Sequence, residues 1–249
     1  QVARVGVGQC DSKRRIPPGR GCAVRLSALF KAVLLEGPSM KRIMLELKIA
    51  GTNFLLVTAA LSFALVLFAA LAGELLDFAP IAFEVVFPLY SAIAAGEWGR
   101  TRCDPCFEAI AAQSPSLFSW ALRRFFAIFA AVSLFALATM LAAACIRPGL
   151  VMGEMLLLYL PTAFFFASVA ALVGAASPQE HLATLMCGLL WLVALLTRSL
   201  LRLFGVEFVY PFLCFAGDQH GVWLYNKAVL AGMGLFLWTT NWFVLRRKS

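Results

Sequence analysis

Long uncharged stretches constrain this sequence more than any other feature. Residues 49–73 are about twenty-five consecutive residues without a charge, and five similar stretches follow before the end. A helix needs roughly 20 apolar residues to cross a hydrocarbon core about 30 Å thick. Six such stretches in 249 residues leave little chain for anything else. The sequence therefore predicts an all-α integral membrane protein, a bundle of six transmembrane helices.

The composition supports this class and narrows the partners. The chain is 62% hydrophobic and 14% charged, whereas an average soluble protein is about 25% charged. A net charge of +8 could suggest a nucleic-acid binder. In membrane proteins, however, basic residues mark cytoplasmic helix ends and contact anionic headgroups. The expected partner is the lipid bilayer, with no nucleic acid. The seven scattered cysteines do not form a secreted disulfide pattern.

The helices and their orientation follow from the uncharged stretches and the basic residues between them. The predicted helices cover about 52–73, 78–96, 125–146, 155–176, a stretch from about 182 that stops before Arg198, and 228–245. With both termini in the cytoplasm, ten basic residues mark inside ends: Lys41, Arg42, Lys48, Arg100, Arg102, Arg123, Arg124, Arg246, Arg247 and Lys248. Four mark outside ends: Arg147, Arg198, Arg202 and Lys227. This excess predicts a multi-pass protein of the cell membrane, N-in and C-in.

Two connections are too long to be simple turns. Residues 97–124 are polar and include a short helical pattern at 107–112. The predicted outer link, 203–226, contains seven aromatic residues, and such rings favour the headgroup level. We expect this link to form interfacial or re-entrant half-helices, broken at Pro211 and Gly217.

The first 39 residues differ from the rest of the chain. They are basic and loop-like, and the first methionine is Met40. One interpretation is that 1–39 are a disordered or non-native extension of a transmembrane domain at 40–249. The other is that 23–36 form a short amphipathic helix on the membrane surface.

Catalytic signatures are missing from the sequence. There is no GxxxxGK[ST] phosphate loop, no HExxH and no GxSxG. The two histidines, His181 and His220, fall on opposite faces in the predicted topology, which disfavours a histidine metal site. Cys103 and Cys106 form a CxxC that could be a redox pair or half a zinc site. Without a second ligand pair, the simpler interpretation is two incidental thiols in a polar loop. We expect neither an enzyme nor a bound cofactor.

Glu84 is the acidic residue placed deepest in a predicted helix. It lies about six residues into the second helix, roughly 9 Å below its edge at 1.5 Å per residue. An ionisable group at that depth usually faces the bundle interior or a wet cavity, where it could line a substrate route. The alternative is that the helix begins later and Glu84 lies at the interface.

The segment around the second helix carries a family resemblance. FPLY at 87–90, EWGRT at 97–101, FEAI at 107–110 and SPS at 114–116 follow one another in this order. The pattern resembles the membrane subunit of ABC-2 type transporters over about residues 41–249. The matching positions are Pro88, Glu97, Arg100, Thr101, Glu108, Pro115 and the pair Arg123–Arg124. Trp98 and the insert at 103–106 depart from the pattern.

The resemblance implies a function. A short helix at about 105–115 would be a cytoplasmic coupling helix that docks on a separate ABC ATPase, which binds the ATP. Phe107 and Ile110 would anchor it and Glu108 would pair with a basic groove. Because six helices are half of the usual transporter, the chain would act as a homodimer or with a related permease.

Under this resemblance, Glu84 and Pro88 would line the translocation path, and the chain would export a substrate that the sequence does not identify. Two other function classes stay open. One is an ATPase-independent small carrier or channel, which would need several charges inside the membrane. The other is a membrane-embedded enzyme or immunity-type interaction protein.

Overall fold

The computed structural model describes residues 52–71, 78–97, 117–146, 150–177, 179, 181–197, 208–213 and 223–246. All of them belong to one compact unit, Glu46–Ser249. They form six α-helices: α3 (Thr52–Leu71), α4 (Phe78–Glu97), α6 (Leu117–Ile146), α7 (Met152–Ala176), α8 (Leu182–Leu196) and α11 (Trp223–Arg246). No strand occurs among the described residues, which confirms the all-α prediction.

Four of these helices, α3, α6, α7 and α11, are long and apolar enough to cross a membrane. The helix α8 is apolar but shorter, with 15 residues. Large apolar side chains such as Leu56, Phe63, Leu134 and Phe236 are exposed on the helices. This is the surface that a hydrocarbon solvent favours, and it agrees with the predicted membrane class.

Two helices begin earlier than predicted. The helix α6 starts at Leu117 rather than near residue 125, and α11 starts at Trp223 rather than near residue 228. The prediction began each of these helices directly after a basic residue, Arg124 or Lys227. Arginine and lysine are good helix formers, however, so the helix can extend through them. Arg124 is buried in α6 with its guanidinium carbon 5.4 Å from the centre of the Trp120 ring, a cation–π geometry.

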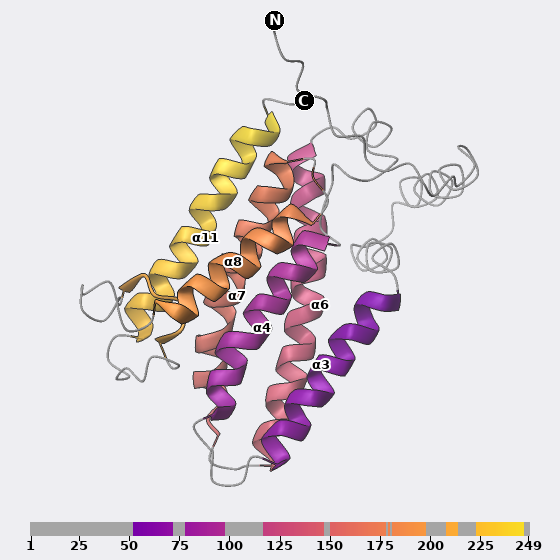
Figure 1. Ribbon diagram of the computed structural model, residues 1–249, viewed down its shortest axis with the longest axis vertical. Helices are drawn as coiled ribbons and strands as arrows, with labels where there is room; N and C mark the ends of the chain where they lie inside the picture. Colours follow the sequence, from indigo (N-terminus) through magenta and orange to yellow (C-terminus); the bar gives the residue numbers. More distant parts are fainter. Residues whose placement is uncertain are drawn as a thin grey trace, which may run out of the picture. The chain divides into compact units, whose positions relative to one another are not determined.

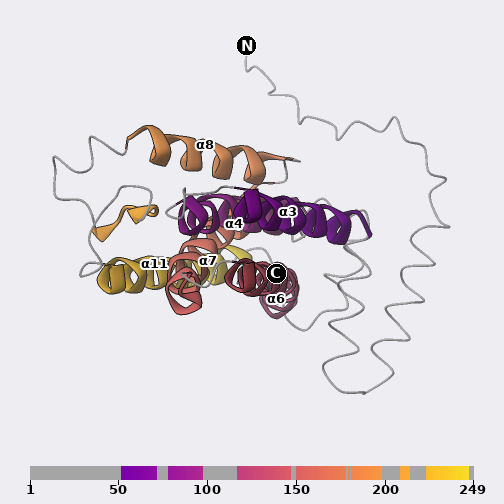
Figure 2. The ribbon, with the colours of Figure 1, turned by 90° about the horizontal axis from the view of Figure 1, so that it is seen from below.

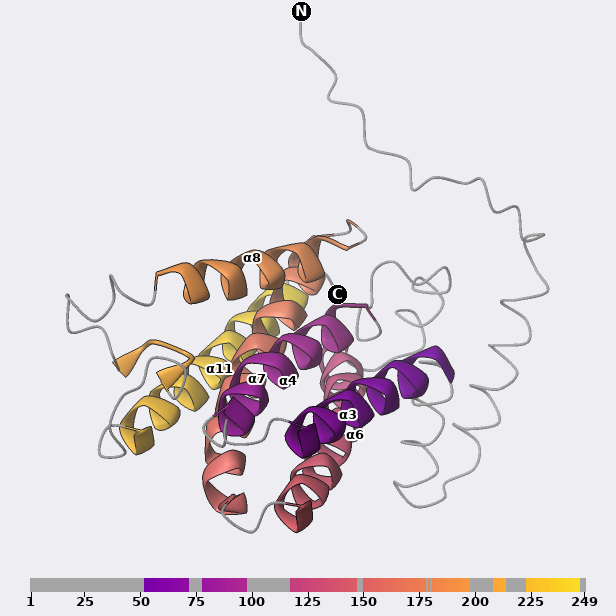
Figure 3. The same ribbon diagram turned by 60° about the horizontal axis from the view of Figure 1, so that its bottom comes forward.

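The most extensive packing joins α7 to α4 and to α11. The helix α8 runs at a slant across α4 and α7 (Figure 1). Viewed from below, α8 lies on one side of α4 and α7 on the other (Figure 2). The helix α3 packs mainly along α6 (Figure 3). The helix α4 therefore lies between α8 and α7, and both neighbours contribute side chains that contact α4 near the site described below.

Two apolar clusters fill the space between the helices. One joins α3, α4, α6 and α7 around residues such as Phe87 and Tyr159, whose rings meet edge to face. The other joins α4, α6, α7, α8 and α11 to the short, mostly irregular segment 208–213. In that second cluster Phe212 is fully buried and stacks on Phe166. Tyr210, Phe212 and Leu213 of this segment are therefore part of the bundle core.

Candidate functional site

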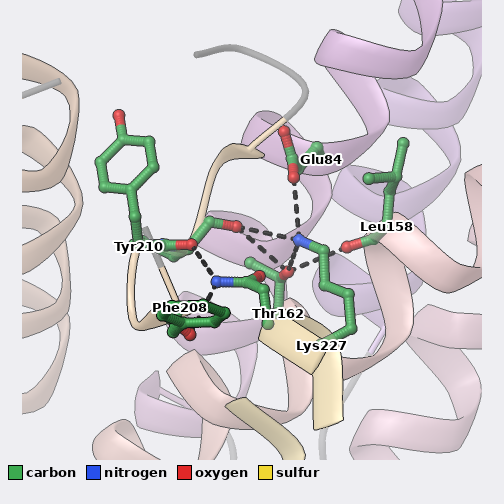
Figure 4. A network of polar contacts seen from close by, with 8 residues as sticks. Glu84, Leu158, Thr162, Phe208, Tyr210 and Lys227 are labelled. Carbon is green, nitrogen blue, oxygen red and sulfur yellow. Dashed lines mark hydrogen bonds and ion pairs between the residues drawn. The ribbon is translucent and has the colours of Figure 1, made fainter. Parts of the chain in front are cut away.

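A buried ion pair joins α4 to α11. The Lys227 ammonium lies 2.8 Å from Oε1 of Glu84, and the two side chains are 1% and 0% exposed (Figure 4). Removing charges from water costs several kcal/mol per ion. Such a pair is therefore retained only where its geometry is good and its remaining hydrogen bonds are satisfied.

The ammonium of Lys227 meets that condition. It donates to Oε1 of Glu84 at 2.8 Å, to the Thr162 hydroxyl at 2.8 Å and to the Pro211 carbonyl at 3.0 Å. An ammonium has three N–H donors and no acceptor, so three acceptors match it in number. The Thr162 hydroxyl donates its own proton to the Leu158 carbonyl at 2.9 Å. Its lone pair therefore remains available for the lysine.

Next to this pair, Asn226 holds the short, mostly irregular segment 208–213. Its amide Nδ2 donates to the carbonyls of Phe208 and Tyr210 at 2.9 and 2.8 Å (Figure 4). Non-helical backbone is tolerated at membrane depth only where protein or water satisfies its polar groups. The first turn of α11 meets this need with two adjacent side chains, Asn226 and Lys227. On the other side, the Tyr210 hydroxyl donates to the Ala194 carbonyl of α8 at 2.9 Å.

Prolines weaken the two helices that face Lys227 by removing the helical donors for the carbonyls of Glu84 and Leu157, and side chains bond the next carbonyl in each helix. Pro88 in α4 and Pro161 in α7 each lack the N–H of a helical hydrogen bond. In the turn before Pro88, the Val85 carbonyl accepts a hydrogen bond from Nε1 of Trp191 at 2.9 Å. In the corresponding turn before Pro161, Leu158 accepts from Thr162. The site is thus built where both helices depart from regular bonding.

A second polar cluster lies at the other end of α4. Oε1 of Glu97 is 2.8 Å from Nδ1 of His181 and accepts from the Thr184 hydroxyl at 2.8 Å. Glu97 is 19% exposed and the His181 side chain 67%. A Cβ on Gly96 would lie 3.2 Å from the Cβ of Ala183, so the two backbones approach closely here. These contacts join the end of α4 to the beginning of α8.

The structure places three of the predicted site residues. Glu84 and Pro88 are buried, and Glu97 ends α4. Because α4 begins at Phe78, the alternative of a later helix start is wrong, and the Glu84 side chain is fully buried in the bundle. The other predicted coupling residues lie outside the part of the chain that the structure describes; they are Arg100, Thr101, Phe107, Glu108, Ile110 and Pro115. Cys103, Cys106 and His220 lie outside it as well.

The predicted start of the last helix after Lys227 was wrong. The structure places Lys227 inside α11, buried against Glu84. The signal that could have predicted the pair is Glu84 itself, because a carboxylate inside an apolar stretch needs a cation. Lys227 was a candidate for that cation, since it directly precedes the last apolar stretch.

The chemistry available at the buried pair is electrostatic. Among the described residues no group of three or more His, Cys, Asp or Glu side chains could hold a metal ion. Cys187 is buried with its thiol against the Phe166 carbonyl at 3.7 Å. The arrangement can hold helices together, and it can release them if the ion pair breaks.

Comparisons of the chain with protein-family models, with curated proteins and with solved structures gave no match. The resemblance to ABC-2 type permeases therefore stays a prediction.

Proposed function

We propose that this chain is the membrane permease subunit of an ATP-binding cassette transporter. It would export a substrate across the cytoplasmic membrane with energy from a separate ATPase, as a homodimer or beside a related permease. The observation that supports this most is that α4 carries a polar side-chain contact toward each end. Glu84 forms an ion pair with Lys227 of α11, and Glu97 lies within hydrogen-bond distance of His181 before α8.

Such a helix is suited to transmit a displacement. Thirteen residues separate Glu84 from Glu97, which is about 20 Å along a helix. The chain after Glu97 enters 98–116, where the resemblance expects the coupling helix. A push on that connection would move α4, and with it both the start of α8 and the buried pair. Intramembrane charges usually mark such working sites.

The six-span, N-in and C-in arrangement is part of the proposal. The helix α4 has twenty residues and is therefore about 30 Å long, which is enough to cross the hydrocarbon core. The fifteen residues of α8 reach only about 22 Å, so α8 would need flanking residues to span. The basic residues predict this orientation, with ten at the inside ends and four, including Lys227, at the outside ends.

A second candidate is an ATPase-independent carrier, and one observation favours it. A carrier was expected to need several charges inside the membrane, and Lys227 now joins Glu84 there. The two candidates differ in their energy source. The permease needs ATP hydrolysis by a partner, whereas the carrier responds to an ion gradient alone.

The test is a substitution in the expected coupling helix. Glu108→Lys should leave membrane insertion intact but abolish stimulation of the partner's ATP hydrolysis, because it places like charges against a basic groove. The matched control is Glu154→Lys, an exposed position in the first turn of α7. The measurement is the activity of the separately purified ATPase after it is mixed with each permease variant in nanodiscs. Normal stimulation and normal transport by the Glu108 variant would exclude the coupling assignment.

A further inference from the structure

Oxygen atoms from three separate elements converge on the tip of Lys227. They are a carboxylate oxygen of Glu84 on α4, the hydroxyl of Thr162 on α7 and the carbonyl of Pro211 in the segment 208–213. The lysine itself comes from a fourth element, α11 (Figure 4). One negative charge with neutral oxygens around it is a ligand set typical of cations in membrane proteins, where broken backbone supplies carbonyls.

Contacts that do not involve Lys227 hold these oxygens in place. Thr162 is oriented by its hydrogen bond to Leu158. The backbone beside Pro211 is held by Asn226, which binds the carbonyl of Tyr210 at 2.8 Å. The turn of α4 that carries Glu84 is tied to α8 by Trp191, which donates to the next carbonyl, Val85. The oxygens are therefore positioned by the bundle and not only by the ammonium.

We propose that Glu84, Thr162 and the Pro211 carbonyl form a binding site for a primary ammonium ion, and that Lys227 is its built-in ligand. The number of acceptors equals the three N–H donors of a primary ammonium. The inference does not depend on an ATPase, because it concerns only what holds α4, α7, α11 and 208–213 together.

The proposal has a direct consequence for a chain without the lysine side chain. Lys227→Ala removes the ammonium and the three outer carbons of its stem but keeps the oxygens. The Glu84 carboxylate is then buried without its cation, which is strongly destabilising. A soluble alkylammonium that fits the vacated space should bind there, and ligand binding to the folded state raises stability.

The experiment compares the thermal unfolding of purified variants in detergent by tryptophan fluorescence. Lys227→Ala should lower the apparent Tm by roughly 10 °C, the order expected for breaking a buried pair in a chain of this size. Millimolar n-propylammonium chloride should restore most of that loss. Tetramethylammonium chloride carries the same charge without N–H donors and should not. The wild type and Lys227→Met, whose sites are filled, should respond to neither salt.

Three results would overturn the proposal. The first is equal rescue of Lys227→Ala by both salts, and the second is rescue of Lys227→Ala/Glu84→Gln, which lacks the anchoring carboxylate. The third comes from variants that keep the lysine and do not depend on recovering Lys227→Ala. Thr162→Val should lower Tm, whereas Thr162→Ser, which keeps the oxygen, should not. A Thr162→Val protein as stable as the wild type would show that the hydroxyl is no part of a site.

Discussion

Glu84 and Lys227 are each costly to bury alone and compatible only as a pair. Glu84→Gln replaces the carboxylate by a neutral amide, so that the buried ammonium of Lys227 has only neutral acceptors around it. Breaking a buried pair in this way costs about 3–5 kcal/mol. We therefore expect Glu84→Gln to lower the free energy of unfolding by that amount, measured by denaturant unfolding in mixed micelles.

The double variant separates the pair from the rest of the site. Glu84→Gln/Lys227→Met removes both charges, and replacing both partners of a buried pair is often close to neutral. We expect the double variant to be more stable than Glu84→Gln alone, so that the two effects do not add. Strictly additive losses would show that the two side chains act independently, against the 2.8 Å contact.

At the scale of single residues, the sequence allowed half of this pair to be predicted. Glu84 interrupts an apolar stretch, and an isolated carboxylate there points to the bundle interior. Lys227 follows the polar segment 217–220 and therefore looked like a flank of the last helix. Which side chain meets Glu84 depends on the packing of α7 against both α4 and α11, and this packing brings together residues 143 positions apart.

At the scale of elements, the segment 208–213 depends on Asn226. Asn226→Leu removes both hydrogen bonds to the carbonyls of Phe208 and Tyr210. Each buried group left unsatisfied costs about 1–3 kcal/mol, so local opening should become about 10- to 100-fold more frequent. Hydrogen–deuterium exchange of 208–213, followed by mass spectrometry, measures this. Asn241→Leu makes the same change further along α11 and should leave exchange of that segment unaltered.

The packing of α11 on α7 provides a second test with a matched control. A Cβ on Gly234 would lie 2.6 Å from the Phe164 ring, whereas a Cβ on Gly232 would meet nothing within 4 Å. Gly234→Ala should destabilise by about 1–3 kcal/mol because the ring must move. Gly232→Ala should be neutral or slightly stabilising, since alanine is the better helix former. Equal thermal stabilities of the two variants would contradict this close approach.

Most helices could be predicted because their apolar stretches are long, but two boundaries could not. A hydropathy pattern ends a predicted helix at a charged residue. It does not show that Arg124 contacts the Trp120 ring or that Lys227 pairs with Glu84, contacts that allow both residues to lie within helices. The outer link was expected to be interfacial or re-entrant. The described part, 208–213, has Tyr210 and Phe212 buried and Phe208 half exposed, so its backbone packs into the bundle.

At the scale of the whole molecule, the fold class was predictable and the helix neighbours were not. Helices such as α7 and α11 are apolar on every side, and such helices have no face that reveals its partner. The polar exceptions carry that information: Thr162, Asn226 and Lys227 all point to the same place.

The orientation of the bundle gives a prediction at this scale. The excess of basic residues at the predicted inside ends favours the proposed N-in, C-in topology. A reporter enzyme active only in the cytoplasm, fused after Ser249, should therefore be active. A reporter active only outside the cell, fused at the same place, should be silent, and the reverse pattern would contradict the topology.

The most direct test of the proposed function is purification of the tagged chain from the membranes of cells that naturally make it. The purified material is photolabelled with an azido-ATP, and the labelled polypeptides are sequenced by mass spectrometry. A permease predicts a labelled partner that carries a phosphate loop, recovered with the wild type and with Glu154→Lys but lost with Glu108→Lys. Wild-type material that transports its substrate without any ATP-labelled partner would contradict the proposal.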